Sequence, residues 1–273
     1  MTDEEAKELF REQQRQVVEG INLVNGVKIR LISKEDIEDL KSGFFPLPAN
    51  LRERISPNTT VLAKNIEVKE NHDFELDRTM RNVVLALRLL KEGYFYGNYV
   101  CYILLPEKRS RILDSLSWDE QPRERRLGFG YALNFDEIPE LKKLLEKLQA
   151  LDFSKRKNLH LACKRFQRTY EESDSEDQLI DLIIAFEALF LKGEKRMSWR
   201  GQTIAIACST LLGKNEQERE EIRSFLTKAY EIRNCIVHGS EYKKPYAKKE
   251  FEMSDFVSEI EDYLRESIKK LLD

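Results

Sequence analysis

Six consecutive residues near the C-terminus combine three side-chain types that can act on a phosphodiester. Arg233 begins this hexapeptide, Asn234 follows it, and His238 ends it. A guanidinium binds phosphate oxygens through a fork of N–H donors, and an imidazole exchanges protons near neutral pH. Together they could move the proton of a 2′-hydroxyl group and neutralise the charge that develops on phosphate oxygens. The pattern indicates phosphodiester chemistry without a metal ion or cofactor.

The spacing of these residues depends on a helix that is predicted over 217–236 from its apolar periodicity. Asn234 and His238 are four residues apart and would share a helix face, while Arg233 would lie about 100° away. Gly239 follows and permits a left-handed residue after the helix. We therefore expect the three polar side chains to stand at the C-terminal end of a helix.

The other two of the three histidines carry weaker signals. His160 stands among lysines and arginines, so it could contact phosphate, although a solvated helix face is the simpler interpretation. His72, between Asn71 and Asp73, is typical of a loop. The Arg-to-His spacing also recurs by chance in many helices, so the surrounding elements must support the interpretation.

The length of 273 residues favours two domains, which we place at 1–150 and 151–273. The chain is expected to be an α+β protein, a mixed α/β domain followed by an all-α bundle. In the first domain, helices are predicted at 3–20 and 77–92, and strands at 27–32, 59–68, 94–105 and 128–133. The tyrosines of 94–102 suit sheet packing better than base stacking. We find no catalytic motif in this domain.

After residue 135 every periodic segment predicts a helix. These helices are expected at 138–151, 159–171, 179–191, 203–212, 217–236 and 254–272. The segment 179–191 is apolar on all sides apart from Asp181 and Glu187, which is typical of the centre of a bundle. Ser175 and Gln178 match a capping box before this helix. Asp181 is expected to be an exposed or interhelical partner without a catalytic role.

Glu187 is a further candidate, because a carboxylate within an apolar helix is costly unless it is paired. It could orient Arg233 or His238, or it could pair with Arg200 for structural reasons. The sequence leaves both alternatives open.

Composition limits the class of protein. Hydrophobic residues make up 41% and charged residues 35%, and no apolar run approaches the length of a membrane span. The acidic N-terminus does not resemble a signal peptide. Four scattered cysteines without CxxC pairing argue against a zinc site and for buried thiols in a reducing cytoplasm. The net charge of −3 would confine any RNA contact to a local site.

Several blocks occur in a fixed order around the hexapeptide. They are Ile180–Leu191, Arg200, Leu211–Gly213 and Ala229–Gly239. In this order they resemble the HEPN superfamily, and its Apea-like branch in particular, over about residues 155–273. The helix around 82–88 is weakly similar to the segment that precedes this domain in the same proteins.

The resemblance implies a helical HEPN bundle that pairs through its motif-bearing helix into a homodimer. It further implies a metal-independent endoribonuclease with Arg233, Asn234 and His238 as catalytic residues and a 2′,3′-cyclic phosphate as product. The usual setting of such proteins is antiviral defence, abortive infection or a toxin system, in which an antitoxin or another regulatory partner takes part. The domain 1–150 would then sense or regulate.

Two features close to the motif bear on partners. Lys243 and Lys244 could hold the RNA backbone near the cleft, although such a charge run is often simply solvated. HEPN toxins that are silenced by adenylylation carry a tyrosine two residues after the histidine, where this chain has Ser240; its nearest tyrosine is Tyr242. Control by tyrosine adenylylation is therefore not expected.

The main alternative is a non-catalytic HEPN module that binds RNA, a nucleotide or a protein partner. The complete Arg233–Asn234–His238 set favours the enzyme, whereas the acidic net charge favours the binding module. A third interpretation is a coincidental motif in a structural bundle.

Overall fold

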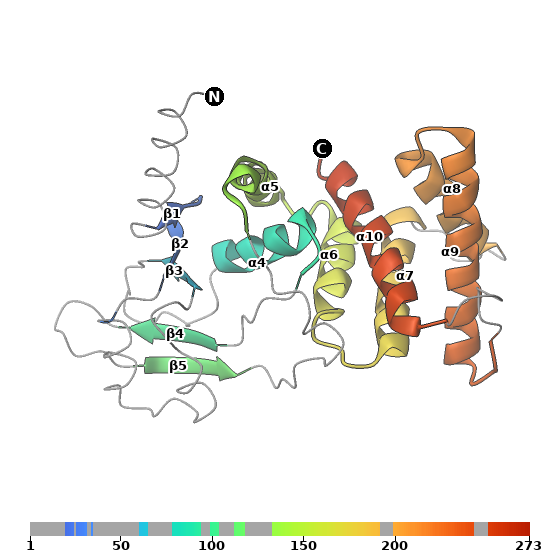
Figure 1. Ribbon diagram of the computed structural model, residues 1–273, viewed down its shortest axis with the longest axis horizontal. Helices are drawn as coiled ribbons and strands as arrows, with labels where there is room; N and C mark the ends of the chain where they lie inside the picture. Colours follow the sequence, from blue (N-terminus) through green and yellow to red (C-terminus); the bar gives the residue numbers. More distant parts are fainter. Residues whose placement is uncertain are drawn as a thin grey trace, which may run out of the picture. The chain divides into compact units, whose positions relative to one another are not determined.

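The computed structural model describes residues 20–24, 26–31, 34, 60–64, 78–93, 99–103, 112–117, 133–191, 199–242 and 251–273. Within these ranges the protein is mainly helical, with two small antiparallel sheets (Figure 1). No helix in this part of the chain is long and apolar enough to cross a membrane. The predicted helix at 3–20 and strand at 128–133 fall outside the described residues, apart from residues 20 and 133.

The first sheet consists of β1 (Ile21–Asn22), β2 (Val27–Leu31) and β3 (Thr60–Lys64), all antiparallel and in that order. Its register aligns Ile21, Ile29 and Leu62 across the three strands. Gly26 has a φ of 76°, a left-handed conformation that glycine adopts without steric cost, and it begins the return into β2. The strands predicted at 27–32 and 59–68 are therefore present.

The second sheet pairs β4 (Tyr99–Ile103) with β5 (Ile112–Ser117) in antiparallel register. β4 lies within the aromatic and β-branched segment for which a strand was predicted. β5 was not predicted, because its few apolar residues are interrupted by Asp and Ser, which have low strand propensity.

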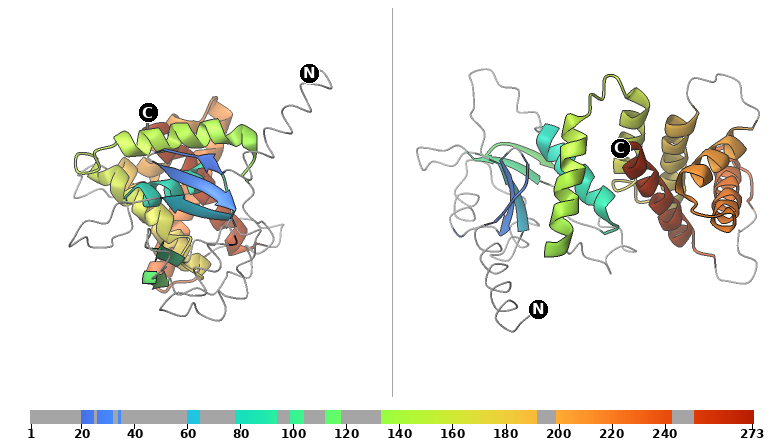
Figure 2. Two further views of the ribbon diagram at one scale, coloured as in Figure 1. Left: turned by 90° about the vertical axis from the view of Figure 1, so that its left-hand side faces the viewer. Right: turned by 90° about the horizontal axis from the view of Figure 1, so that it is seen from above.

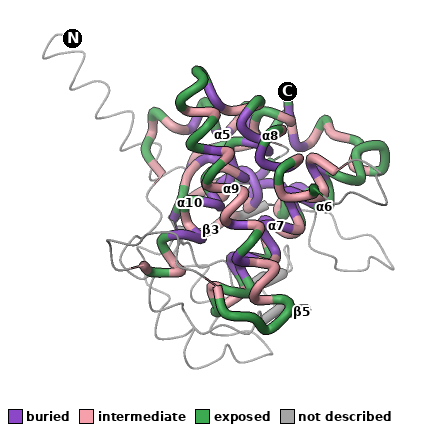
Figure 3. The backbone as a smooth tube through the Cα atoms, turned by 90° about the vertical axis from the view of Figure 1, so that its right-hand side faces the viewer, coloured by how far each residue is buried: buried purple, intermediate pink, exposed green. Residues whose placement is uncertain are grey.

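The helices begin and end close to the residues predicted from the sequence, and Figure 2 shows them from two further sides. They are α4 (Arg78–Leu90), α5 (Ile138–Ala150), α6 (Lys157–Arg168), α7 (Ser175–Phe190), α8 (Arg200–Leu212), α9 (Glu216–Val237) and α10 (Met253–Leu271). Buried and exposed positions alternate along them at helical spacing, as an amphipathic sequence requires (Figure 3).

The chain divides into two compact units. One comprises Met1–Val84, Phe95–Glu120 and Ala132–Glu146, and the other comprises Leu85–Tyr94, Gln121–Tyr131 and Lys147–Asp273. The described strands belong to the first unit, while α6 to α10 and the last residues of α4 and α5 belong to the second. The division at residue 150 into separate domains stays a prediction.

The helix α7 is the centre of the second unit, because it packs against α6, α8, α9 and α10. Its buried residues include Leu182 and Phe186 on one face, and also Asp181 and Ile183, which are two residues apart and so lie about 160° from each other around the helix. The expectation that this apolar segment forms the centre of the helices is confirmed. The N-cap of α7 was predicted at Ser175, one residue after its actual position. Asp174 is the N-cap, since its carboxylate accepts the backbone N–H groups of Glu176 and Asp177.

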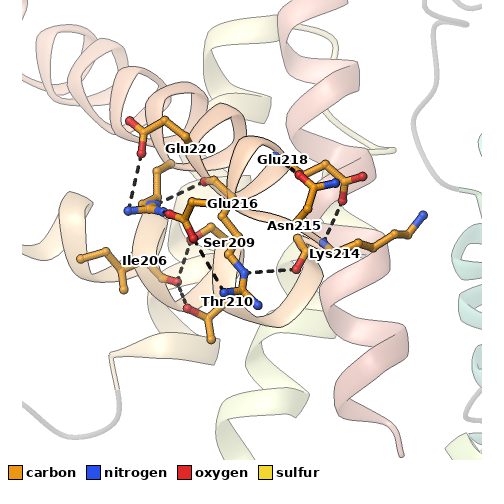
Figure 4. A network of polar contacts seen from close by, with 11 residues as sticks. Ile206, Ser209, Thr210, Lys214, Asn215, Glu216, Glu218 and Glu220 are labelled. Atoms are coloured by element: carbon orange, nitrogen blue, oxygen red, sulfur yellow. Dashed lines mark hydrogen bonds and ion pairs between the residues drawn. The ribbon is translucent and has the colours of Figure 1, made fainter.

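The start of α9 is fixed by a dense set of polar contacts at its junction with α8 (Figure 4). The Asn215 side chain caps the helix by accepting the backbone N–H of Glu218 at 2.9 Å. The Glu218 carboxylate accepts the N–H of Lys214 at 2.8 Å in return. A Cβ at Gly213 would lie 2.5 Å from the Arg219 side chain, so only glycine allows this close turn. The junction therefore sets how α9 lies along α8.

An ionic cluster joins the turn after α6 to α10 within the second unit. The hydroxyl of Tyr170 donates to Glu261 at 2.6 Å, and the Arg265 guanidinium pairs with the same carboxylate at 2.7 Å. Arg265 Nε also donates to the backbone oxygen of Arg88 at 2.9 Å. The guanidinium of Arg88 lies 4.4 Å from the Tyr170 ring centroid. Glu261 and Arg265 are buried and Arg88 is partly buried, and the bonds among these groups offset part of the cost of desolvation.

Candidate functional site

The C-terminal end of α9 closes as a Schellman motif, which places the motif residues. Gly239 has a φ of 66° and donates its N–H to Ile236 O at 3.1 Å. Ser240 donates to Cys235 O at 2.8 Å, and together these bonds satisfy two of the last carbonyls of the helix. His238 is the C-cap residue and its side chain is exposed. The left-handed cap predicted from Gly239 is therefore present.

Arg233 and Asn234 lie in the last turns of α9, and both are partly buried. The Arg233 Nη1 donates to Asn234 Oδ1 at 3.1 Å. The Arg233 guanidinium carbon lies 5.8 Å from the ring centroid of Tyr230, within the range of a cation–π contact. Arg233 Nε is buried and meets no hydrogen-bond acceptor among the described residues. The guanidinium is thus held by one amide and one aromatic ring.

Glu187 lies in α7 and makes two contacts that connect it with the site. Its Oε1 accepts the hydroxyl of Tyr230 at 3.1 Å and lies 3.9 Å from Arg200 Nη1. No bond joins Glu187 to Arg233 directly among the described contacts. The sequence left open whether Glu187 pairs with Arg200 or orients the motif residues. In the structure it lies near Arg200, and it also bonds Tyr230, which contacts Arg233.

The pKa of Tyr230 is raised, mainly because the phenol is desolvated and also because the Glu187 carboxylate faces it. A phenol with an ordinary pKa is already protonated at neutral pH, so the hydroxyl is the donor in its bond to Glu187, and the raised pKa extends this state to more alkaline pH. The two nearby guanidinium groups, of Arg233 and Arg200, oppose the shift.

The remaining predicted residues are less closely connected with the motif. Lys243 and Lys244 lie outside the described residues. His160 is exposed on α6, and its ring lies 4.8 Å from that of Phe153. Asp181 is a buried interhelical partner, since it bonds Arg165 of α6 at 2.7 Å. Tyr242 donates to Glu176 at the start of α7 at 3.3 Å.

Two residues of the site were missed by the sequence analysis. Tyr230 stands one turn before Arg233, and this i, i+3 spacing could have indicated an aromatic contact with the guanidinium. Gly201 packs against the Tyr230 ring, because a Cβ at Gly201 would lie 2.8 Å from two ring atoms. Nothing in the sequence signals the second contact, since it depends on how α8 and α9 meet.

Apolar side chains are exposed on the two helices that carry the site. Val237 at the end of α9 is 50% exposed, and Trp199 and Ile206 of the α8 region are exposed to 65% and 56%. Single exposed apolar residues are common on protein surfaces, whereas contiguous apolar patches are typical of sites that bind another protein.

The arrangement offers a partly buried cation, an amide and an exposed imidazole at one helix end. Such a set could bind a phosphodiester and move protons at its oxygens. We compared the chain with models of protein families, with curated proteins and with solved structures, and none of the three comparisons found a match.

Proposed function

We propose that this protein is a metal-independent endoribonuclease of the HEPN type that acts as a homodimer. In this proposal residues 151–273 form the HEPN bundle, and residues 1–150 form an α+β domain that senses or regulates. The observation that carries the proposal is the end of α9, where Arg233 is held by Asn234 and Tyr230 while His238 is exposed.

The proposed reaction is an internal displacement at phosphorus. The 2′-hydroxyl oxygen attacks the adjacent phosphate as His238 takes its proton, or His238 donates a proton to the departing 5′-oxygen. Arg233 neutralises the additional negative charge on the phosphate oxygens. The products are a 2′,3′-cyclic phosphate and a free 5′-hydroxyl, so the reaction needs no external oxidant or cofactor.

The homodimer is proposed because Arg233 and His238 of one chain do not point to the same side of α9. Arg233 and His238 are five residues apart, which corresponds to about 140° around a helix. Two copies of α9 facing each other would place the arginine of one near the histidine of the other. The exposed Val237 supplies apolar surface for such pairing. Lys243 and Lys244 would hold the RNA backbone beside this cleft. The setting proposed is cytoplasmic defence, abortive infection or a toxin system with a regulatory partner.

The test is cleavage of total RNA in the presence of EDTA, with analysis of the ends formed. We expect cyclic phosphate ends from the native protein. Because the imidazole exchanges the protons and the guanidinium neutralises charge, His238→Ala and Arg233→Ala should each lower the rate by about 10²- to 10⁴-fold.

The control is His160→Ala, which removes an exposed histidine away from α9 and should cleave like the native protein. Cleavage that persists in His238→Ala or Arg233→Ala would contradict the assignment of these residues. A dimer that binds RNA or a nucleotide but leaves RNA intact would favour the binding module instead.

A further inference from the structure

Tyr230 lies between the motif and the rest of the helix bundle. It precedes Arg233 by one turn of α9, and its ring faces the Arg233 guanidinium at 5.8 Å. A guanidinium over an aromatic ring is attracted by the negative face of the ring, more strongly where water is excluded. The ring therefore forms one side of the place where Arg233 rests.

The position of the ring is set from two other helices. Its hydroxyl donates to Glu187 of α7 at 3.1 Å. Its edge packs on Gly201 of α8, where an added Cβ would approach ring atoms to 2.8 Å. A ring held at its hydroxyl and along its side has little freedom to turn.

Glu187 is itself placed by charge. Its carboxylate lies 3.9 Å from Arg200 Nη1 at the first turn of α8. Arg200 is about 41% exposed, so the pair is partly screened and contributes orientation more than stability. Contacts therefore run from Arg200 to Glu187, from Glu187 to Tyr230, and from Tyr230 to Arg233.

Arg233 has few other restraints. Its Nη1 donates to Asn234, while its buried Nε meets no acceptor among the described residues. A long side chain with a single hydrogen bond would sample several rotamers unless packing selects one. The Tyr230 ring is the described group that supplies this packing.

We propose that Tyr230 is a positioning residue: its ring holds the Arg233 guanidinium in place for the phosphate, and Glu187 and Gly201 hold the ring. The inference rests on the proposed function for its catalytic consequence. It extends that function by giving Glu187 its part in the site, through Tyr230 rather than by a bond to Arg233.

The kinetic test compares Tyr230→Leu with Tyr230→Phe in cleavage of RNA. Tyr230→Leu removes the ring, and we expect kcat to fall by about 10- to 100-fold while KM changes by less than about threefold. Tyr230→Phe keeps the ring and loses only the anchor, so it should recover most of this loss. Gly201→Ala displaces the ring without altering Tyr230 and should also lower kcat.

The matched control is Tyr170→Phe. It removes the same hydroxyl from the same kind of bond, a tyrosine to a glutamate at 2.6 Å, but between the turn after α6 and α10. It should lower the unfolding midpoint and leave the cleavage rate unchanged. A Tyr230→Leu protein that cleaves within twofold of the native rate would overturn the proposal.

A second measurement does not depend on activity. The Arg233 side-chain Nε–H group is observed by NMR and assigned by its loss in Arg233→Lys. We expect slow exchange with water in the native protein, because this group is buried, and exchange at least about tenfold faster in Tyr230→Leu. Equal exchange in the two proteins would refute the positioning role. If the native protein cleaves no RNA, the proposed function fails, and the exchange measurement alone still decides the role of Tyr230.

Discussion

At the scale of single residues, Asn234 leaves Arg233 its full charge, which in the proposed ribonuclease would be available for a phosphate. Its Oδ1 is a neutral acceptor for Arg233 Nη1 at 3.1 Å, so the bond orients the guanidinium without cancelling its charge. An amide is suited to this place for that reason.

Changing the amide to a carboxylate tests this point. Asn234→Asp should keep the bond to Arg233 but neutralise the cation and repel the phosphate. We expect the rate of RNA cleavage to fall by at least about tenfold, since like charges a few ångströms apart near a surface repel by more than 1 kcal/mol. The control Asn158→Asp makes the same change at an exposed position of α6. Equal rates in native and Asn234→Asp proteins would contradict the role of the amide.

The sequence indicated the residues of the site better than their connections. The helical spacing and Gly239 sufficed to predict Arg233, Asn234 and His238 at a capped helix end. That Glu187 meets Arg233 only through Tyr230 depends on the relative positions of α7, α8 and α9. Local propensity and periodicity contain no information about such tertiary distances.

At the scale of elements, α9 is defined by a side-chain cap at its start and by a backbone cap at its end. Asn215 begins it, and Gly239 ends it. The helices after residue 135 were predicted closely because their apolar faces repeat at 3.6 residues. The N-cap of α7 was misplaced because Asp174 and Ser175 are both good capping residues, and the choice between them follows from backbone geometry.

The cap of α9 can be tested by stability. Asn215→Ala removes the acceptor for the Glu218 N–H and should lower the free energy of unfolding by about 1 kcal/mol, measured by urea denaturation. Asn158→Ala makes the same change at an exposed position in the first turn of α6, where Asn158 is not the N-cap residue, so the change should be neutral or slightly stabilising. Equal shifts for both variants would show that the cap contributes nothing.

At the scale of the whole molecule, buried thiols make the free energy of unfolding depend on pH in the alkaline range. Cys163 and Cys208 are both buried, as the sequence led us to expect, whereas Cys235 is only partly buried. Burial raises the pKa of Cys163 to about 12 and that of Cys208 to about 11. An unfolded thiol titrates near 8.5.

The sign of the effect follows from these pKa values. Below about pH 8.5 both states keep the protons, and the contribution is fully present. Above it the unfolded chain loses its protons first, so the free energy of unfolding should fall between about pH 9 and 11. The slope is at most about 1.4 kcal/mol per pH unit for each thiol. The free energy of unfolding, measured by urea denaturation, should depend less on pH in the double variant Cys163→Ala/Cys208→Ala than in the native protein. Parallel curves for the two proteins would contradict this role of the thiols.

The ionic cluster around Tyr170 has a consequence for dissecting the chain. Arg88 O accepts Arg265 Nε at 2.9 Å, and the Arg88 guanidinium covers the Tyr170 ring. A fragment that starts after residue 150 lacks both groups, and Arg265 would lose a partner for a buried donor. A truncated protein would thus be weakened in its interior and not only shortened. Keeping residues 85–94 with the helical half preserves those contacts.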